Sequence, residues 1–300
     1  MELFSRLRRF LVRQRPVQRL VNRNISVPGL PRRRVQPGLV AAVTMVRNEA
    51  DIIGHTVRHL LKQGVDLIIV VDNLSTDRTP RVLAELAAED SRVFVGRDTL
   101  DAYHQNRKMS RLAHLAHRAG ADWVVLFDAD EFWFSKDGRV ADYLRAYPGE
   151  SRVLGARLRD ARPLGVEGVS LDDASDSLRL DIDSYTEKVA IRPRGWVWVD
   201  QGNHTALDLG STAPSELRII HIPHRSYDQW RRKVSVGAAS LENASLPWAI
   251  GNHWRDGAAL PAGEEMNHWR RMVEDADGTV VPLPSRWRSW ADRRNQRHPL

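Results

Sequence analysis

An Asp-x-Asp pair is the most chemically suggestive pattern in the sequence. Asp128 and Asp130 directly follow the apolar run WVVLF at residues 123–127. Carboxylates that converge at a strand end repel each other unless a cation, a hydrogen-bond donor or a shared proton compensates them. The simplest compensating group is a hard divalent cation, Mn²⁺ or Mg²⁺, which keeps positions open for phosphate oxygens. The pair therefore predicts a metal-assisted site for a phosphate-containing substrate, with solvated loop acids or helix N-caps as the alternative interpretation.

Two other apolar runs also end in polar residues. Asn48 and Glu49 follow the run at residues 39–46, and Asp72 follows LIIVV at residues 67–71, with Asp77 a few positions later. Ligands of open α/β sheets bind outside the carboxyl ends of the strands. If these strands are parallel, their acidic ends converge on one edge of the sheet.

The elements that must position these residues alternate along residues 39–135. Apolar strands are expected at 39–46, 67–71, 92–96 and 123–127, with helices between them, the first running from Asp51 to Gly64. This alternation predicts an α/β fold with a mostly parallel sheet flanked by helices. Residues 136–245 are expected to form a smaller, mixed half. Its expected elements are strands at 188–192, 196–199 and 217–221 and a helix over 226–242.

The positive charge is concentrated at the N-terminus. The formal net charge is +7, but the first 38 residues contain ten arginines and one glutamate, and the rest carries a net charge of −2. A nucleic-acid-binding domain would spread basic residues over a folded face, so no nucleic-acid partner is expected. Residues 1–24 are predicted to form a basic amphipathic helix, broken at Pro16, that meets an anionic membrane surface. The alternatives are a helix packed on its own domain and a disordered tail.

Three segments are predicted from these patterns. Residues 1–38 are the tail and linker, with the linker at 25–38; residues 39–245 are the catalytic domain; and residues 246–300 are a Trp- and Arg-rich extension. The chain has no cysteine, which removes disulfides and thiolate chemistry. It also lacks an apolar run long enough to cross a bilayer, so a cytoplasmic location at the inner face of a membrane is expected.

Three motifs occur in order and resemble family 2 glycosyltransferases. They are the pair Asn48-Glu49, the set Asp72, Asn73, Ser75, Asp77 and Thr79, and the pair Asp128 and Asp130. The stretch VTMVRNEADIIGHTVRHLLKQGVDLIIVVDNLSTDRT is similar to the opening of that family, and ADWVVLFDADEFW is similar to its Asp-x-Asp strand. The resemblance covers about residues 40–135, and a weaker one covers HIPHRSYDQWRRKV at 221–234. It implies the GT-A fold and a transferase that uses a nucleotide-diphosphate sugar with Mn²⁺ or Mg²⁺.

The resemblance also implies roles for individual positions. Thr44, Glu49 and Asp72 would lie around the base and ribose, Asp128 would face the ribose or the metal, and Asp130 would coordinate the metal. Asn48 and Asp77 are grouped with the nucleotide-sugar-binding residues.

The second half is expected to complete the site. His221 is preferred over His224 as a third metal ligand, and Arg225 and Lys233 are expected to pair with the diphosphate. Lys108 is expected to reach the phosphates as well, together with Arg107. The alternatives are a surface histidine and solvated helix faces.

The catalytic base is expected in VDQGNHT. An inverting transferase needs a group that deprotonates the acceptor hydroxyl, and the candidates are Asp200 and His204, with Glu187 as a third choice. Trp133, Trp196 and Trp198 are candidates to stack on the acceptor, with core packing as the alternative.

The sequence as a whole predicts a metal-dependent, inverting glycosyltransferase. Its acceptor would be a glycan, a lipid-linked molecule or a small molecule. A dinucleotide oxidoreductase is disfavoured because no G-x-G-x-x-G follows the first strand. The remaining alternative is a catalytically inactive sugar-nucleotide-binding or membrane-surface protein of the same fold.

Overall fold

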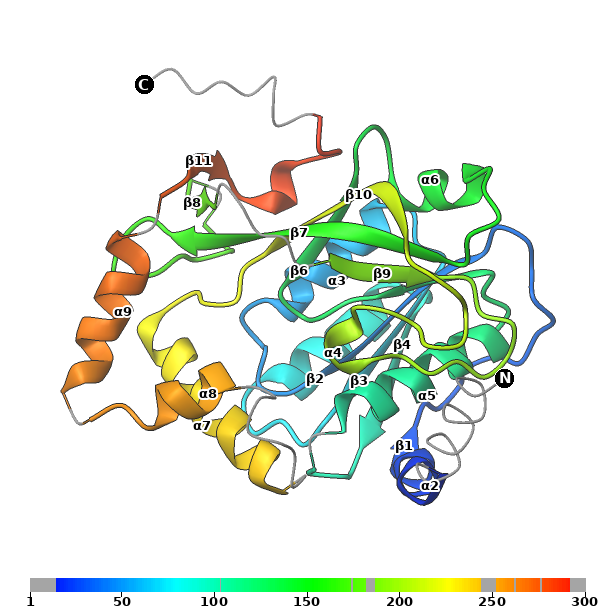
Figure 1. Ribbon diagram of the computed structural model, residues 1–300, viewed down its shortest axis with the longest axis horizontal. Coiled ribbons are helices and arrows are strands. Elements are labelled where there is room, and N and C mark those ends of the chain that lie inside the picture. The colour runs from blue at the N-terminus through cyan, green and yellow to red at the C-terminus, as the bar shows by residue number, and fades with distance from the viewer. Residues whose placement is uncertain are drawn as a thin grey trace.

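A single twisted sheet with helices on both sides organises the molecule (Figure 1). The computed structural model describes residues 15–291, apart from 103, 174, 182–186, 244–251, 262 and 276. The strands of the sheet follow the spatial order β1-β4-β3-β2-β5-β9-β7-β10-β6. The mixed α/β fold expected from the sequence is confirmed.

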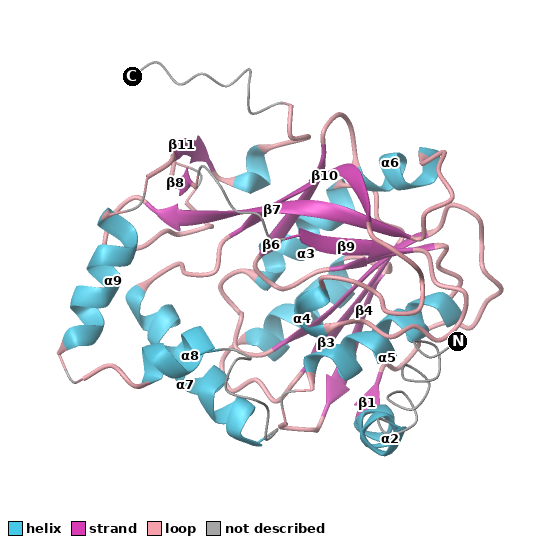
Figure 2. Ribbon diagram, in the orientation of Figure 1, coloured by secondary structure: helices cyan, strands magenta, loops and turns pink. Residues whose placement is uncertain are grey.

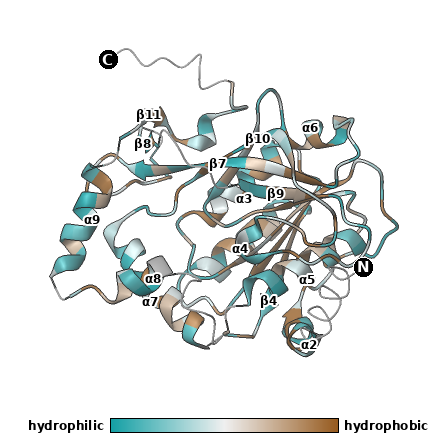
Figure 3. Ribbon diagram, in the orientation of Figure 1, coloured by the Kyte–Doolittle hydropathy of each residue, from teal (hydrophilic) through white to brown (hydrophobic). Residues whose placement is uncertain are grey.

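The first half of the sheet is parallel. Its strands are β2 (Val40–Val46), β3 (Leu67–Asp72), β4 (Val93–Asp98) and β5 (Trp123–Leu126). β2 pairs in parallel with both β3 and β5, and β3 pairs in parallel with β4. Strands buried on both faces are apolar almost throughout, which is why these segments read as continuous hydrophobic runs and appear brown in Figure 3.

Helices cover both faces of this half. Alternate side chains of β3 belong to two different clusters: Ile68 and Val70 pack in one, and Ile69 and Val71 pack in the other. The first cluster is completed by α3 (Ile53–Lys62), α4 (Thr79–Glu89) and α6 (Val140–Ala146). The second is completed by α5 (Gln105–Arg118) and by Val21 of α2 (Arg15–Asn24). The carboxyl ends of the strands are left open between these layers.

The second half of the sheet is mixed. It contains β6 (Glu131–Ser135), β7 (Val153–Pro163), β9 (Glu187–Ile191) and β10 (Ala213–His221). β10 runs parallel to β7 and antiparallel to β6, and β9 runs antiparallel to β5 and β7. β6, β7 and α6 were not expected. The strand expected at 196–199 is wrong, because this segment contributes only an isolated bridge between Val199 and Ala206.

The C-terminal part packs against the body (Figure 2). It contains α7 (Tyr227–Asn243), α8 (Asn252–Ala258), α9 (Glu264–Glu274), β11 (Thr279–Pro282) and the short helix η2 (Pro284–Arg286). β11 pairs with β8 (Ser177–Leu180), which in turn pairs with β7. Trp287 and Trp290 pack near Phe134 of β6. The Trp-rich segment therefore supplies core aromatic residues.

The N-terminal segment also lies on the body. α2 begins at Arg15 with Pro16 in its first turn, and residues 1–14 of the expected amphipathic helix lie outside the described part of the chain. β1 (Ile25–Ser26) pairs antiparallel with β4. A Cβ atom on Gly96 would lie 2.5 Å from the carbonyl oxygen of Ser26, so this close approach requires glycine. Among the helices that the structure describes, none is long and apolar enough to cross a membrane.

Candidate active site

A cleft of about 880 Å³ opens at the carboxyl ends of the parallel strands. The first half of the chain contributes strand-end residues, and the second half contributes residues of β10, α7 and the turn after residue 200. The predicted residues that line the cleft are Asn48, Glu49, Asp128, Asp130, His204, His221, His224 and Lys233.

The loop after β2 is held by the loop after β3. Asn48 has a positive φ of 58°, and its side-chain oxygen accepts hydrogen bonds from the backbone N–H groups of Thr76 (2.7 Å) and Asp77 (3.3 Å). Asp77 accepts from the backbone N–H groups of Thr79 and Ala50. Asn48 and Asp77 therefore fix the shape of this part of the cleft, and Asp77 itself does not line it.

Asp72 carries a carboxylate oxygen that is buried and has no hydrogen-bond partner among the described residues. Its other oxygen accepts a long hydrogen bond of 3.4 Å from the N–H of Ser75. A buried acceptor is costly unless something donates to it. Thr44 is fully buried in β2, where its hydroxyl donates to the carbonyl of Met45. Neither Asp72 nor Thr44, both predicted to lie around the base and ribose, lines the cleft.

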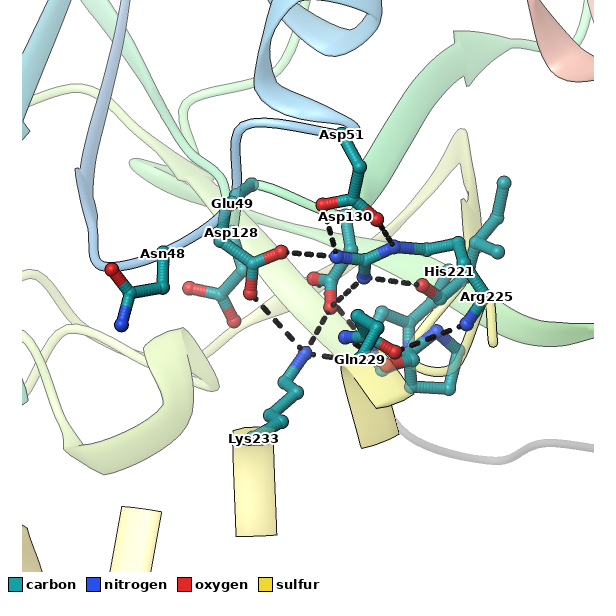
Figure 4. A network of polar contacts seen from close by, with 12 residues as sticks. Asn48, Glu49, Asp51, Asp128, Asp130, His221, Arg225, Gln229 and Lys233 are labelled. Atoms are coloured by element: carbon teal, nitrogen blue, oxygen red, sulfur yellow. Dashed lines mark hydrogen bonds and ion pairs between the residues drawn. The ribbon is translucent and has the colours of Figure 1, made fainter. Parts of the chain in front are cut away.

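Asp130 lies at the centre of a network of acidic and basic side chains (Figure 4). Lys233 of α7 donates to Oδ2 of Asp130 and lies 3.6 Å from Oε1 of Glu49. Arg225 is 2% exposed and donates to both Glu49 and Asp51, and it lies 3.8 Å from Oδ2 of Asp130. Arg225 is therefore held between the two halves, behind the cleft that Lys233 lines.

The charges in this network stabilise one another. Burial alone would raise the pKa of Asp130, but Lys233, His221 and Arg225 outweigh it and hold that pKa well below its ordinary value. Burial would lower the pKa of Lys233, and the charges of Asp130 and Glu49 raise it instead. A buried ion pair is retained only where further hydrogen bonds satisfy both partners.

Asp128 faces a different cation. Lys188 of β9 donates to its Oδ2 at 2.6 Å and lies 3.0 Å from Oε1 of the buried Glu131. The other oxygen of Asp128 accepts from Asn203 at 3.1 Å and from Gln105 at 3.4 Å. Burial raises the pKa of Glu131, although Lys188 opposes this shift. Asp128 thereby connects the strand end to β9 and to the short helix η1 (Gln201–Asn203).

The strand register distinguishes His221 from His224. His221 lies opposite Glu131 of β6 and opposite Asp160 of β7. Its Nδ1 is 2.8 Å from Oδ1 of Asp160, and its Nε2 is 3.4 Å from Oδ1 of Asp130. Burial would lower the pKa of His221, but the two aspartates raise it to about 10. Burial, followed by Lys233 and His221, lowers the pKa of His224 to about 3.

The donor set around Asp130 determines how a divalent cation could be held. Within the described ranges, no group of three or more His, Asp or Glu side chains is arranged to hold a metal ion. Asp130 and His221 nevertheless direct an oxygen and a nitrogen toward each other, with the far side of the imidazole fixed by Asp160. Mg²⁺ and similar cations are often bound by one or two protein ligands together with substrate phosphates. A cation held here would have to displace the proton that Asp130 and Asp160 stabilise on the imidazole of His221, and a diphosphate would have to supply its remaining ligands.

The two candidates for the base differ in their surroundings. Asp200 accepts a hydrogen bond from the N–H of Gln201 and caps η1, and it does not line the cleft. His204 is exposed and lines the cleft, with its Nδ1 2.6 Å from the carbonyl oxygen of Glu187. A carbonyl can only accept, so Nδ1 carries the proton and Nε2 is left as an acceptor. Gly202, with φ of 77°, lies beneath this ring, because a Cβ atom there would be 2.5 Å from Nε2.

Several predicted residues are not in the cleft. The ammonium of Lys108 is completely buried, 2.7 Å from Oδ2 of Asp98 and hydrogen-bonded to the carbonyl of Leu100, so it cannot reach a phosphate. The guanidinium of Arg107 stacks over Trp198. Trp133 is fully buried, and Trp196 packs against Trp198. Among the described residues, Trp254 of α8 lines the cleft, and the sequence did not single it out.

The sequence also missed Lys188 and Asp160. Lys188 reaches Asp128, and Asp160 reaches His221, because strands far apart in the sequence pair in the sheet. No local sequence pattern indicates these contacts. The burial of Lys108 could have been predicted from helical spacing, because Lys108 is four residues before Leu112 and both lie on the buried face of α5.

The fold and the site indicate where a ligand would bind. Asp128 and Asp130, at the end of a parallel strand, face Lys188 and Lys233 at the edge where open α/β sheets bind their ligands. Residues 41–149 match the family described as "Glycosyl transferase family 2". This match covers 109 of the 300 residues, and it falls on the part of the chain that carries the three motifs.

More distant likenesses exist among solved structures. The S. aureus TarS fragment 1–349 in complex with UDP has 11% identity and a TM-score of 0.40, over 85% of this chain and 99% of that one. The Pyrobaculum calidifontis mannosyltransferase PcManGT, in complex with GDP-Man and Mn²⁺, has 16% identity and a TM-score of 0.43, over 85% and 80%. Likenesses this low carry no argument about the ligand or reaction of this chain. Among curated protein sequences, none matches it.

Proposed function

We propose that this protein is a glycosyltransferase that moves a sugar from a nucleotide-diphosphate sugar to an acceptor hydroxyl. One observation carries the proposal: the acidic strand ends of the family 2 segment and the basic side chain of Lys233 meet in one cleft. A sugar donor of this kind has a polar nucleoside at one end and a diphosphate in the middle. It needs hydrogen-bond acceptors for the first and positive charge for the second.

The donor would lie along the strand ends with its diphosphate near Lys233. The side chain of Lys233 is 22% exposed, whereas that of Arg225 is 2% exposed. Lys233 is thus a cation that a phosphate oxygen can reach, whereas Arg225 is buried and positions Glu49. The role of Asp72 near the base and ribose stays a prediction from the family resemblance, because its unpartnered oxygen is buried and the residue does not line the cleft.

Asp130 and His221 would hold a divalent cation, Mn²⁺ or Mg²⁺, against the diphosphate. When bound, such a cation acts as a Lewis acid that stabilises negative charge on the leaving diphosphate. Asp160 would not coordinate the cation. It would accept a hydrogen bond from Nδ1 of His221 and so keep the proton of the imidazole on that nitrogen. Asp128, which Lys188 and Asn203 engage, would orient the loop that carries Asp130.

His204 would act as the general base. Its Nε2 would take the proton of the acceptor hydroxyl while the hydroxyl oxygen forms the new bond to the anomeric carbon. The bond between that carbon and the diphosphate oxygen breaks, and its electron pair leaves with the diphosphate. Attack from the face opposite the leaving group inverts the anomeric configuration. Asp200 is the weaker candidate because its carboxylate caps η1.

The acceptor class stays open between a glycan, a lipid-linked molecule and a small molecule. A cytoplasmic location likewise stays a prediction. A catalytically inactive protein that only binds sugar nucleotides is the competing possibility, and the experiment below separates the two.

The test is a panel of nucleotide-diphosphate sugars assayed for release of the nucleoside diphosphate, with and without Mn²⁺. At least one donor should be turned over and should raise the melting temperature of the protein. Lys233→Met should lower kcat/KM for that donor 10- to 100-fold, as expected for a charged hydrogen bond worth about 1.5–3 kcal/mol. Lys136→Met is the matched control, because Lys136 is exposed and lies outside the cleft. Binding without turnover would support the inactive alternative, and no binding by any donor would refute the proposal.

A further inference from the structure

Several exposed arginines lie on helix α5 and on the two segments that contact its ends. α2, the linker at residues 25–38 and α5 contain no acidic residue. We call the exposed or half-exposed arginines of these three segments the basic face. Its members are Arg19, Arg23, Arg32, Arg33, Arg34, Arg111 and Arg118. The basic face therefore includes residues of the folded body as well as of the N-terminal segment.

Specific contacts bring these segments together. Near the first turn of α5, Gln18 of α2 donates to the carbonyl of Arg107. At its other end, the N–H of Arg33 donates to the carbonyl of Arg118, and the N–H of Gln36 donates to that of Gly120, both at 2.9 Å. The linker is thus fastened along the end of α5, and its arginines have fixed positions relative to the body.

The charges of the basic face have no carboxylate partners in the described part of the chain. Within the described residues, none of its seven arginines forms an ion pair with a carboxylate. Burial, and then the charges of Arg118 and Arg32, lower the pKa of Arg111, which places these three side chains within each other's fields. An uncompensated cluster of this kind attracts an anionic partner.

Two large apolar side chains project from the same segments. Leu20 of α2 is 46% exposed, and Val35 of the linker is 42% exposed. Sugar-phosphate backbones offer little for such side chains to contact. The interface of an anionic bilayer accepts both, because arginines reach lipid phosphates while apolar side chains enter the acyl boundary.

We propose that the basic face, with Leu20 and Val35, binds the surface of a membrane that contains anionic lipids. The proposal enlarges the predicted contact of residues 1–24 to include the linker and the exposed edge of α5. It does not depend on the transferase activity, because the cleft is formed by other residues.

The experiment uses the full chain and sedimentation with phosphatidylcholine vesicles, with and without phosphatidylglycerol. The wild type should bind only the vesicles that contain phosphatidylglycerol, and less at high salt. The triple variant Arg32→Gln, Arg33→Gln, Arg34→Gln should lower the partition coefficient by about 100-fold, since each arginine contributes about one factor of five. The matched control removes the same charge elsewhere, through Arg78→Gln, Arg270→Gln, Arg271→Gln, all exposed residues outside the basic face.

Two further readouts complete the test. Leu20→Ser with Val35→Ser should weaken vesicle binding without any change of net charge, and all variants should keep the melting temperature of the wild type. Equal losses in the triple variant and its control would overturn the proposal, because net charge alone would then explain binding. Binding to duplex DNA in place of vesicles would overturn it as well. Donor turnover measured without vesicles reports on the transferase separately.

Discussion

The two walls of the cleft are built in different ways. The acidic wall, made by Glu49, Asp128 and Asp130, follows two strands of the parallel half, β2 and β5. Its first loop is fixed by contacts of short range in sequence, such as those of Asn48 with residues 76 and 77. The basic wall, made by Lys188, His221 and Lys233, comes from three elements that meet only in the folded chain. Each of its charges is compensated by a carboxylate of the other wall.

The charges of the two walls therefore neutralise one another across the cleft. A cluster of carboxylates can be read from sequence because it repeats at strand ends. The cations that balance it are scattered over residues 188–233. We therefore expect the loss of a central carboxylate of the acidic wall to lower the rate of catalysis most. We expect the loss of a buried cation of the basic wall to lower the free energy of unfolding most.

The largest effect is expected for Asp130→Asn. The variant removes the charge that pairs with Lys233 and lies beside His221, so neither a cation nor Lys233 keeps its place. Turnover of the donor found in the panel should fall by about 10³-fold. Asp137→Asn is the control, because Asp137 is exposed after β6 and outside the cleft. Full activity in Asp130→Asn would remove this residue from the centre of the acidic wall.

Lys188→Met tests the buried cation. Lys188 is 8% exposed between Asp128 and Glu131, and its loss leaves two carboxylates without their counter-ion. The free energy of unfolding, measured in urea, should fall by about 3 kcal/mol. The double variant Lys188→Met, Glu131→Gln should recover part of that loss, since one buried charge is then removed with its partner. A loss below about 1 kcal/mol would show that the two walls are independently stable.

His204→Gln tests the base. Glutamine can keep a hydrogen bond to the carbonyl of Glu187 but cannot take a proton from the acceptor. Once an acceptor is found, kcat for transfer should fall by about 10²-fold while KM for the donor stays the same. Asp200→Asn, measured alongside, should leave kcat within a few-fold. The reverse pattern would assign the base to Asp200.

The smallest effect concerns the joint between the halves and the pH dependence of stability. His59 of α3 is buried, and its Nε2–H donates to the carbonyl of Trp133 in β6. Burial lowers its pKa from 6.5 to about 4. Between these values the unfolded chain binds a proton that the folded protein does not. Stability should therefore decrease by about 2 kcal/mol from pH 7 to pH 5.

The measurement is urea unfolding of the wild type and of His59→Gln at both pH values. The variant keeps a donor for the carbonyl of Trp133 but has no titrating group at position 59. Its free energy of unfolding should therefore fall by about 2 kcal/mol less than that of the wild type between pH 7 and pH 5. An equal change in the two proteins would mean that His59 titrates as it does in the unfolded chain.

The sequence predicted the parallel half well because buried strands are apolar along their whole length. It singled out His221 through the resemblance of residues 221–234 to known transferases and Lys233 through its charge, and the roles of both stay predictions. It could not predict Lys188 or Asp160, because the partner of each is set by how β9, β7 and β10 pair. The prediction that Lys108 reaches the phosphates fails for the same reason, because no local pattern in the sequence indicates that Lys108 pairs with Asp98.

The pairing of β1 with β4 protects one edge of the sheet from pairing with another molecule. β4 would otherwise be the outermost strand on that side, with backbone N–H and C=O groups open to another chain. The two residues of β1 cover part of this row, and the glycine at position 96 lets them sit close. A chain shortened past residue 26 would expose an unprotected strand edge. Its aggregation would then be an effect of strand pairing, separate from any loss of contact with lipid.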